Sequence, residues 1–131
     1  MPLDEPVLLA AEPQLFVGDL PAALSFYLEQ LGFTLVFAHG NPPFYAQVRR
    51  GGARLNLREV PGPVFSPGFR LRERDALSAT ITVEDIDALA RDYDAAGIDW
   101  HQRPRTEPWG ARTCIVRDPD GNLIAFAGDP G

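Results

Sequence analysis

The chain of 131 residues contains no lysine and a single cysteine. All 12 of its basic residues are arginine, and 18 Asp and Glu residues outnumber them, so the net charge is −6. An acidic chain without a basic run is a poor binder of nucleic acid. The lone thiol, Cys114, excludes an internal disulfide, and its position in an expected strand suggests a small core or pocket residue.

Long apolar stretches are also missing. No segment is long and hydrophobic enough to cross a membrane, and no signal-peptide pattern opens the chain. We therefore expect a cytoplasmic protein without a membrane partner. Hydrophobic residues make up 45% of the chain, which suffices for the core of one domain, residues 1–131. Residues 1–11 are expected to form a loose arm or an extra edge segment.

The most informative feature that is present is an internal repeat. Residues 17–24 read VGDLPAAL and are followed by Tyr27 and Gly32, whereas residues 83–90 read VEDIDALA and are followed by Tyr93 and Gly97. Equivalent valines, aspartates and tyrosines lie 66 residues apart, and the glycines 65. Two copies of one unit imply a pseudo-twofold structure with a ligand site between the copies.

Each copy predicts a β-α-β-β-β unit. The aspartates, Asp19 and Asp85, suit helix N-caps, apolar residues follow at helical spacing, and Gly32 and Gly97 suit C-terminal caps. Gly-Gly and Asp-Gly sequences mark a closing hairpin in each copy because such turns need positive φ. Strands are expected over residues 13–18, 33–38, 44–49 and 53–59, and again over 78–83, 98–101, 111–117 and 122–127.

The two units belong to one α+β domain. Module one covers about residues 12–59, module two about 78–127, and a linker over 60–77 joins them. The linker is not a domain boundary, because one copy alone would leave a sheet edge and an apolar helix face open.

The paired units, together with VGDL at residues 17–20 and RDPDGN at 117–122, resemble the vicinal oxygen chelate superfamily. This superfamily includes glyoxalase I, extradiol dioxygenases, fosfomycin-resistance transferases and bleomycin-resistance proteins. The resemblance covers residues 12–127, and EPWGAR at 107–112 is most similar to the bleomycin-resistance proteins. It implies an incomplete barrel of mixed sheet around a concave cleft, with helices outside. It also implies a homodimer that exchanges modules or the N-terminal arm.

The resemblance also implies where a metal would bind. Superfamily enzymes take two ligands per module from the concave face, and alignment on the motifs puts these positions at Glu12, Asn56, Ser78 and Ala125. Of these, Glu12 alone is a strong ligand for a divalent metal. We therefore expect no metal and no cofactor, which favours the branch that binds and sequesters a drug. The alternative is a glyoxalase-like lyase or dioxygenase-like metalloenzyme with a divalent metal at an atypical Glu12 site, where Glu12 would be the catalytic group.

Strand alternation selects the residues that face the cleft. Leu15, Leu55, Leu57 and Ala79 should pack under the helices, and their neighbours should face the opposite side. Aromatic residues at strand ends and in loops add stacking surfaces, and Trp109 stands in a loop that borders the drug crevice in bleomycin-resistance proteins. The candidate ligand-binding residues are Gln14, Phe16, Phe44, Arg54, Asn56, Arg58, Ser78, Thr80, Trp100, His101, Trp109 and Arg112.

The charge of the ligand stays open at this point. Known bleomycin binders offer acidic crevices to a cationic drug, whereas inward-facing Arg54, Arg58 and Arg112 would favour carboxylates or phosphates. The small-molecule partner is thus a bleomycin-like drug or an anionic metabolite. A second alternative is a subunit or regulatory module whose sheet face is covered by a partner protein.

Overall fold

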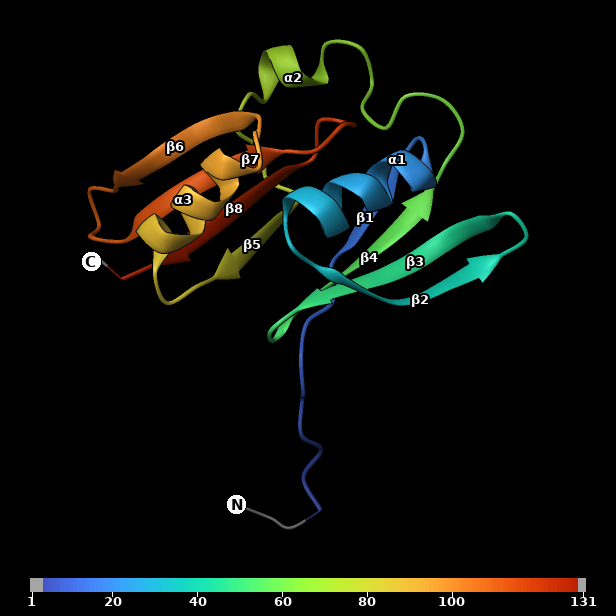
Figure 1. Ribbon diagram of the computed structural model, residues 1–131, viewed down its shortest axis with the longest axis horizontal. Helices are drawn as coiled ribbons and strands as arrows, with labels where there is room; N and C mark the ends of the chain where they lie inside the picture. The colour runs from blue at the N-terminus through green and yellow to red at the C-terminus, as the bar shows by residue number, and fades with distance from the viewer. Residues whose placement is uncertain (1–3, 130–131) are drawn as a thin grey trace.

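Two four-stranded sheets stand side by side in the computed structural model, which describes residues 4–129 (Figure 1). Sheet A contains, in spatial order, β1 (Gln14–Val17), β4 (Ala53–Glu59), β3 (Pro43–Arg50) and β2 (Thr34–Gly40). Sheet B contains β5 (Ala79–Thr82), β8 (Leu123–Gly128), β7 (Arg112–Arg117) and β6 (Trp100–Thr106). Each sheet therefore comes from one repeat, as the predicted β-α-β-β-β units require, and β1 and β5 are edge strands.

The strand register repeats along with the sequence. β1 runs parallel to β4 with Gln14 opposite Asn56, and β5 runs parallel to β8 with Thr80 opposite Ala125. The remaining neighbours are antiparallel. Neither sheet closes into a barrel, so each keeps one face without a helix.

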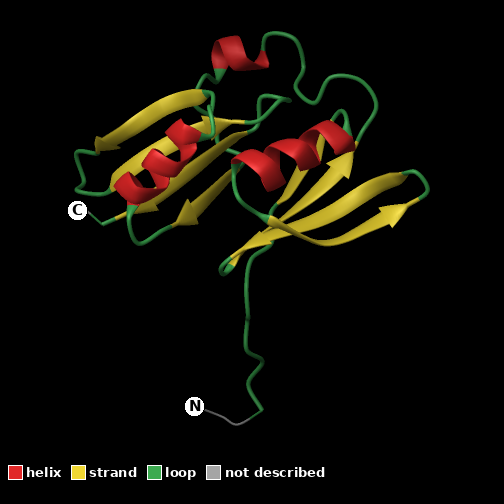
Figure 2. Ribbon diagram, in the orientation of Figure 1, coloured by secondary structure: helices red, strands yellow, loops and turns green. Residues whose placement is uncertain are grey.

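One helix from each repeat lies on the same side of the molecule (Figure 2). In the first repeat, α1 (Leu20–Ser25) continues as one π-helical turn, η1 (Phe26–Gln30), and the second repeat forms α3 (Ile86–Ala95). The predicted caps are confirmed: the Asp19 carboxylate accepts from Ala22 N at 3.1 Å, and Asp85 accepts from Ala88 N at 3.0 Å. These bonds satisfy free amides of the first turn.

Glycine ends both helices, as the repeat predicts. Gly32 and Gly97 have φ values of 78° and 75°, in the left-handed region that a side chain disfavours. The next residues close equivalent hydrogen bonds, from Phe33 N to Tyr27 O at 2.9 Å and from Ile98 N to Tyr93 O at 3.1 Å.

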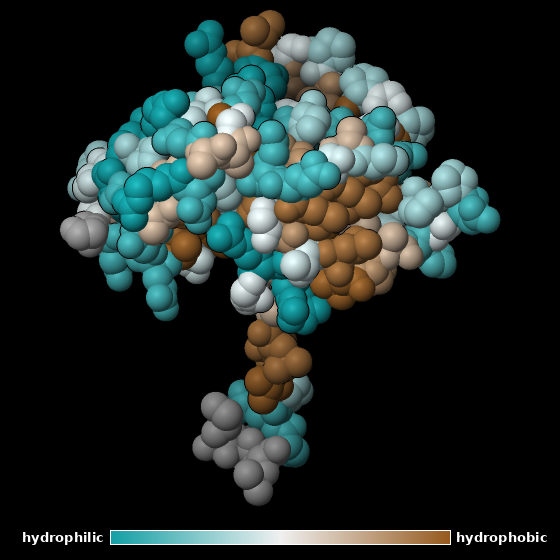
Figure 3. Space-filling view, viewed as in Figure 1, coloured by the Kyte–Doolittle hydropathy of each residue, from teal (hydrophilic) through white to brown (hydrophobic). Residues whose placement is uncertain are grey.

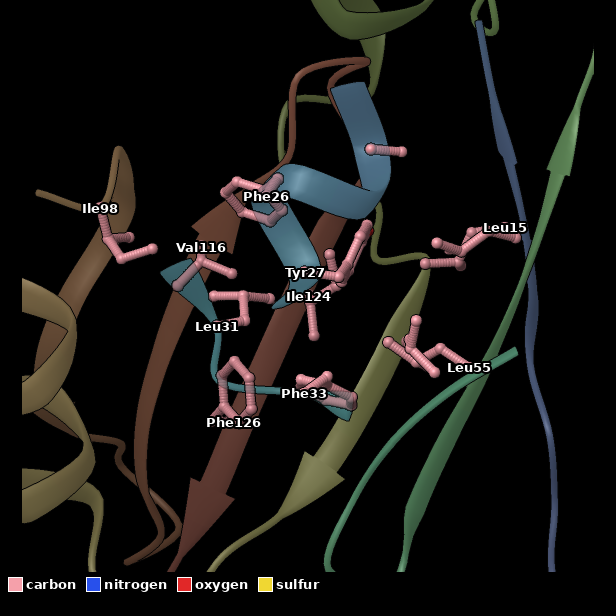
Figure 4. Packing of buried hydrophobic residues seen from close by; sticks show 14 of the residues in the cluster. Leu15, Phe26, Tyr27, Leu31, Phe33, Leu55, Ile98, Val116, Ile124 and Phe126 are labelled. Atoms are coloured by element: carbon pink, nitrogen blue, oxygen red, sulfur yellow. The ribbon is translucent and has the colours of Figure 1, made fainter. Parts of the chain in front are cut away.

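The core joins the two modules. Leu15 and Leu55 point from sheet A toward the helical layer, where Tyr27 and Leu31 meet Ile124 and other side chains of sheet B (Figure 4). The predicted alternation is confirmed, since Leu15, Val17, Leu55, Leu57 and Ala79 are all at most 8% exposed. Burial of this shared apolar surface is the main force that holds the modules together.

The two repeat-equivalent tyrosines each donate a hydrogen bond to the other module. The Tyr27 hydroxyl donates to Asp118 Oδ2 at 2.8 Å, and the Tyr93 hydroxyl donates to Leu31 O at 3.0 Å. Burial raises the pKa of the Tyr93 hydroxyl to about 12, and burial beside Asp118 raises the pKa of Tyr27 as well. Both phenols therefore remain protonated donors at neutral pH.

The Asp-Pro-Asp-Gly-Asn turn of module two docks on module one. Asp118 is 3% exposed, and its carboxylate also accepts from the backbone amides of Asp120 and Asn122. Asn122 Nδ2 donates to Phe16 O at 2.9 Å, and Gly18 N donates to Asp120 Oδ1 at 2.9 Å. This motif therefore connects the β7–β8 hairpin to the β1–α1 junction.

Two details differ from the prediction. β6 is longer than the strand expected over residues 98–101, because register shifts on either side of Gln102 let an edge strand accommodate Pro104. The linker contains a short helix, α2 (Phe69–Arg72), that was not predicted. Its Arg70 guanidinium lies 4.5 Å from the centre of the Phe65 ring and donates to Gly121 O.

An extended arm leaves the body ahead of β1 (Figure 1). Val7, Leu8 and Leu9 are 73%, 95% and 92% exposed, which is unusual for three consecutive apolar side chains. Residues 4–11 form no strand, so of the two expectations they match the arm and not the edge segment. Residues 1–3 lie outside the described residues. None of the described helices is both long and apolar enough to span a bilayer.

Candidate functional site

The helix-free surface of sheet A, here called the open face, combines aromatic and polar side chains. Pairing across the strands places Phe16, Arg58, Tyr45 and His39 in one row, and Gln14, Asn56, Gln47 and Phe37 in the next. Phe16 and Phe37 are 44% and 43% exposed, and the Phe37 ring stacks on Tyr45 at 6.1 Å. Half-exposed aromatic rings on a rigid sheet are suited to stack against a flat ligand.

A hydrogen-bonded cluster occupies the centre of the open face. Gln47 is 6% exposed, and its Nε2 donates to Glu12 Oε1 at 2.8 Å and to Asn56 Oδ1 at 2.9 Å. Arg54 Nη1 donates to Gln47 Oε1 at 3.2 Å. The Gln47 side chain is thereby fixed from three sides, which gives the face a preorganised polar centre.

Three of the four residues at the positions where the family holds its metal have hydrogen-bond partners within the protein. Glu12 and Asn56 do come together, but both their oxygens accept from the amide nitrogen of Gln47. Ser78 Oγ donates to Asn122 Oδ1 at 2.8 Å, and Ala125 has no ligating atom. Among residues 4–129, no group of three or more His, Cys, Asp or Glu side chains is placed to hold a metal.

The corresponding face of sheet B has a different character. Ile115, Leu123 and Ala125 form a small buried apolar cluster there. Beside it, the buried Glu107 carboxylate accepts from Arg105 Nε at 2.8 Å and Thr113 Oγ1 at 2.7 Å, and these bonds lower the pKa of Glu107. The two halves thus share a backbone plan but present unlike surfaces.

Trp109 lies at the tip of the β6–β7 connection. The loop is closed by backbone bonds from Glu107 N to Ala111 O at 2.7 Å and from Gly110 N to Glu107 O at 2.9 Å. The Trp109 side chain is 75% exposed, so a fixed loop presents a large aromatic ring to solvent. It lies outside the open face of sheet A and remains a predicted ligand contact.

Trp100 and Arg112 face the helical layer, contrary to their expected orientation toward the cleft. Trp100 lies opposite the buried Val116 and donates from Nε1 to Asp94 at 2.7 Å. Arg112 lies two residues before the buried Cys114 and therefore on the same side of β7. Its guanidinium makes a two-point ion pair with Asp87 at 2.8 and 2.9 Å. This hydrogen-bonded pair lowers the pKa of Asp87 and raises that of Arg112. The prediction overlooked that Asp87, on the first turn of α3, attracts the arginine.

Three other predicted residues lie apart from the open-face cluster. His101 is held between Asp75, 2.7 Å from Nε2, and Arg117, 2.9 Å from Nδ1. The Phe44 ring packs edge-on against His39 near the end of β3. Thr80 is exposed on β5, at the inner edge of sheet B.

The structure thus brings together Gln14, Phe16, Arg54, Asn56 and Arg58, and adds residues that the prediction missed. Gln47 was within reach of sequence reasoning, because the Gly-Gly hairpin places it opposite Asn56. Phe37 was not, because a register shift between Leu35 and Phe37 breaks the alternation of β2.

The sequence and the fold both match those of known proteins. The family model of the Glyoxalase/Bleomycin resistance protein/Dioxygenase superfamily matches residues 9–126, and the chain belongs to this family. It is 32% identical to a bleomycin resistance protein of Geobacillus stearothermophilus over 136 aligned positions, covering 91% of this chain and 96% of the relative. A bleomycin resistance protein of Staphylococcus aureus matches with the same identity and coverage.

Solved structures agree in fold. The bleomycin-binding protein of bleomycin-producing Streptomyces verticillus, complexed with copper(II)-bleomycin, is 28% identical, with a TM-score of 0.74 over 96% of this chain and 100% of that one. TioX from Micromonospora sp. ML1 is 25% identical, with a TM-score of 0.71 over 91% of this chain and 97% of that one.

Proposed function

We propose that the protein binds an antibiotic-like small molecule on the open face of sheet A and sequesters it without chemical change. The observation that carries this proposal is the combination of half-exposed Phe16 and Phe37 with a fixed polar centre at Gln47. The family relatives named for bleomycin resistance, and a related structure that holds bleomycin, support the same function.

The charges on the open face favour an anionic group on this ligand. Arg49, Arg54 and Arg58 all project from the same side of β3 and β4, where Glu12 is the acidic neighbour. No hydrogen bond or ion pair within residues 4–129 involves the Arg58 guanidinium, which leaves its donors available to a carboxylate or sulfonate. We therefore favour a flat aromatic ligand that carries an acid over a cationic drug of the bleomycin type.

Binding in this proposal needs no metal. The support is chemical: Glu12 and Asn56 share the amide of Gln47, and neither Ser78 nor Ala125 completes a ligand set. The alternative, a lyase or dioxygenase using Glu12 and a divalent metal, predicts that Mn²⁺, Ni²⁺, Zn²⁺ or Fe²⁺ raises the melting temperature and that Glu12→Ala abolishes the shift.

We further propose that the protein is a cytoplasmic homodimer that exchanges its N-terminal arm. The exposed apolar side chains of Val7, Leu8 and Leu9 support this, because a second copy would remove them from water (Figure 3). Removal of residues 1–10 should then give a monomer in sedimentation velocity. A dimer that survives this deletion would contradict arm exchange.

Isothermal titration calorimetry tests the binding proposal. Bleomycin and an anionic flat aromatic, anthraquinone-2-sulfonate, are titrated into the wild type and into Arg58→Gln. We expect the sulfonate to bind more tightly and Arg58→Gln to weaken it about tenfold, the usual effect of losing one charge-assisted hydrogen bond.

Arg91→Gln is the matched control, because it removes an exposed arginine from α3 without altering the open face. Equal loss in both variants would mean that net charge, rather than the open face, determines binding. If neither compound binds while a metal stabilises the protein, the enzyme alternative replaces the proposal.

A further inference from the structure

A cavity lies between the two modules and borders the open face at Arg54. It has a volume of about 730 Å³, within the range of about 300–1,000 Å³ usual for small-molecule sites. One wall comes from β5 and the segment after it, and the other from the β3–β4 hairpin and the residues ahead of β1. The β3–β4 hairpin of module one and strand β5 of module two therefore form its sides.

The floor of this cavity is apolar. Phe33 and Leu55 from module one meet Leu89 and Phe126 from module two, and Figure 4 shows Leu55 pointing from sheet A toward Phe33. These four side chains are themselves at most 7% exposed, so the space between them offers a water-poor surface to an apolar body. None of them belongs to the open face.

Two arginines stand at the hairpin end. Arg50 donates from Nη1 to Leu31 O at 2.8 Å and more weakly to the Tyr93 hydroxyl at 3.4 Å. Its guanidinium also lies 6.0 Å from the centre of the Tyr93 ring, which fixes its position. Within residues 4–129, Nε and Nη2 of Arg50 make no hydrogen bond. Arg54 lines the same end, whereas the acidic Glu84 lies on the β5 side.

We propose that this inter-module cavity is a second binding site, for a small amphipathic monoanion such as an aliphatic carboxylate. The apolar chain would lie against Phe33, Leu55 and Phe126, and the carboxylate would accept hydrogen bonds from Arg50. The two arginines outweigh Glu84, so the cavity favours an anion over a cation. A ligand here would contact both modules at once and thus resist their separation.

Decanoate is a suitable first ligand, with decanol as its uncharged counterpart. We expect calorimetry to give one decanoate per chain and at least tenfold weaker binding of decanol. Arg50→Gln should weaken decanoate about tenfold and leave decanol unchanged. Because Arg50 also contacts Leu31 and Tyr93, a melting curve must first show that the Arg50→Gln variant is folded.

A second pair of variants does not depend on Arg50. Gly52 lines the cavity, its φ lies outside the left-handed region, and a Cβ added there meets no atom within 4 Å. Gly52→Trp should therefore fill the entrance and abolish decanoate binding, whereas Gly52→Ala should bind as the wild type does. Arg58→Gln, which alters only the open face, should also leave decanoate binding intact.

Three results would overturn this site. Decanoate that binds equally well to Gly52→Trp, or that is lost in Arg58→Gln, occupies another surface. If an ammonium ligand such as decylamine binds more tightly than decanoate, then Glu84 and not the arginines determines which charge the cavity prefers. Binding that appears only after removal of residues 1–10 would mean that a second copy's arm fills the cavity in the intact protein.

Discussion

At the scale of single residues, burial decides what each reactive group can do. Cys114 is fully buried beneath α3, and burial raises the pKa of its thiol to about 12. Since the thiolate is the reactive form, native protein should react with a disulfide reagent at pH 8 more than about a thousandfold more slowly than a free thiol. Absorbance at 412 nm with dithiobis-nitrobenzoate measures this. Rapid release from the native chain would contradict the buried position.

Glu107 gives a prediction about pH. Hydrogen bonds from Arg105 and Thr113 lower the pKa of this carboxyl in the folded state. Its contribution to stability is therefore present above the unfolded pKa of about 4.3 and is lost as the pH falls through the lower folded pKa. Urea denaturation between pH 3 and 7 should show Glu107→Gln less stable than the wild type at pH 7, with the gap closing below about pH 4. A gap independent of pH would contradict this assignment.

At the scale of elements, the two repeats allow a matched test of helix capping. Asp19→Ala and Asp85→Ala each remove one carboxylate that accepts from the first turn of a helix, at 3.1 and 3.0 Å. Each variant should lose about 1 kcal/mol of unfolding free energy, as N-cap removal usually does. Urea denaturation followed by circular dichroism measures both. Unchanged stability in either variant would mean that the cap contributes nothing in that repeat.

The helices and strands could be predicted from the sequence more accurately than the residues of the candidate site. Caps, glycines and hairpins are local signals, so β1, β4, α3 and their counterparts were predicted with nearly correct bounds. The length of β6 and the position of Phe37 depend on register shifts, which leave no local pattern. The orientation of Arg112 depends on Asp87, a partner 25 residues away, and could be settled only by tertiary packing.

At the scale of the whole molecule, the reciprocal tyrosines predict unequal effects. Tyr27→Phe deprives the buried Asp118 of a hydrogen bond and should cost about 1–3 kcal/mol. Tyr93→Phe should cost less, because Leu31 O keeps its bond from Arg50. Both proteins should still unfold in one cooperative transition, since the core spans both modules. Two separate transitions in calorimetry would show that the modules are independent.

The linker is dispensable to the topology, because each sheet is complete within one repeat and the boundary is crossed by side chains rather than by strands. The chain is thus a natural candidate for a split protein. If the chain is cut within the exposed segment at residues 61–63, each fragment retains a full sheet. Each fragment also keeps one of the two tyrosines, Tyr27 or Tyr93, that bond to the other module. Reassembly of such fragments would report when two fused proteins meet, and a ligand held between the modules would strengthen that signal.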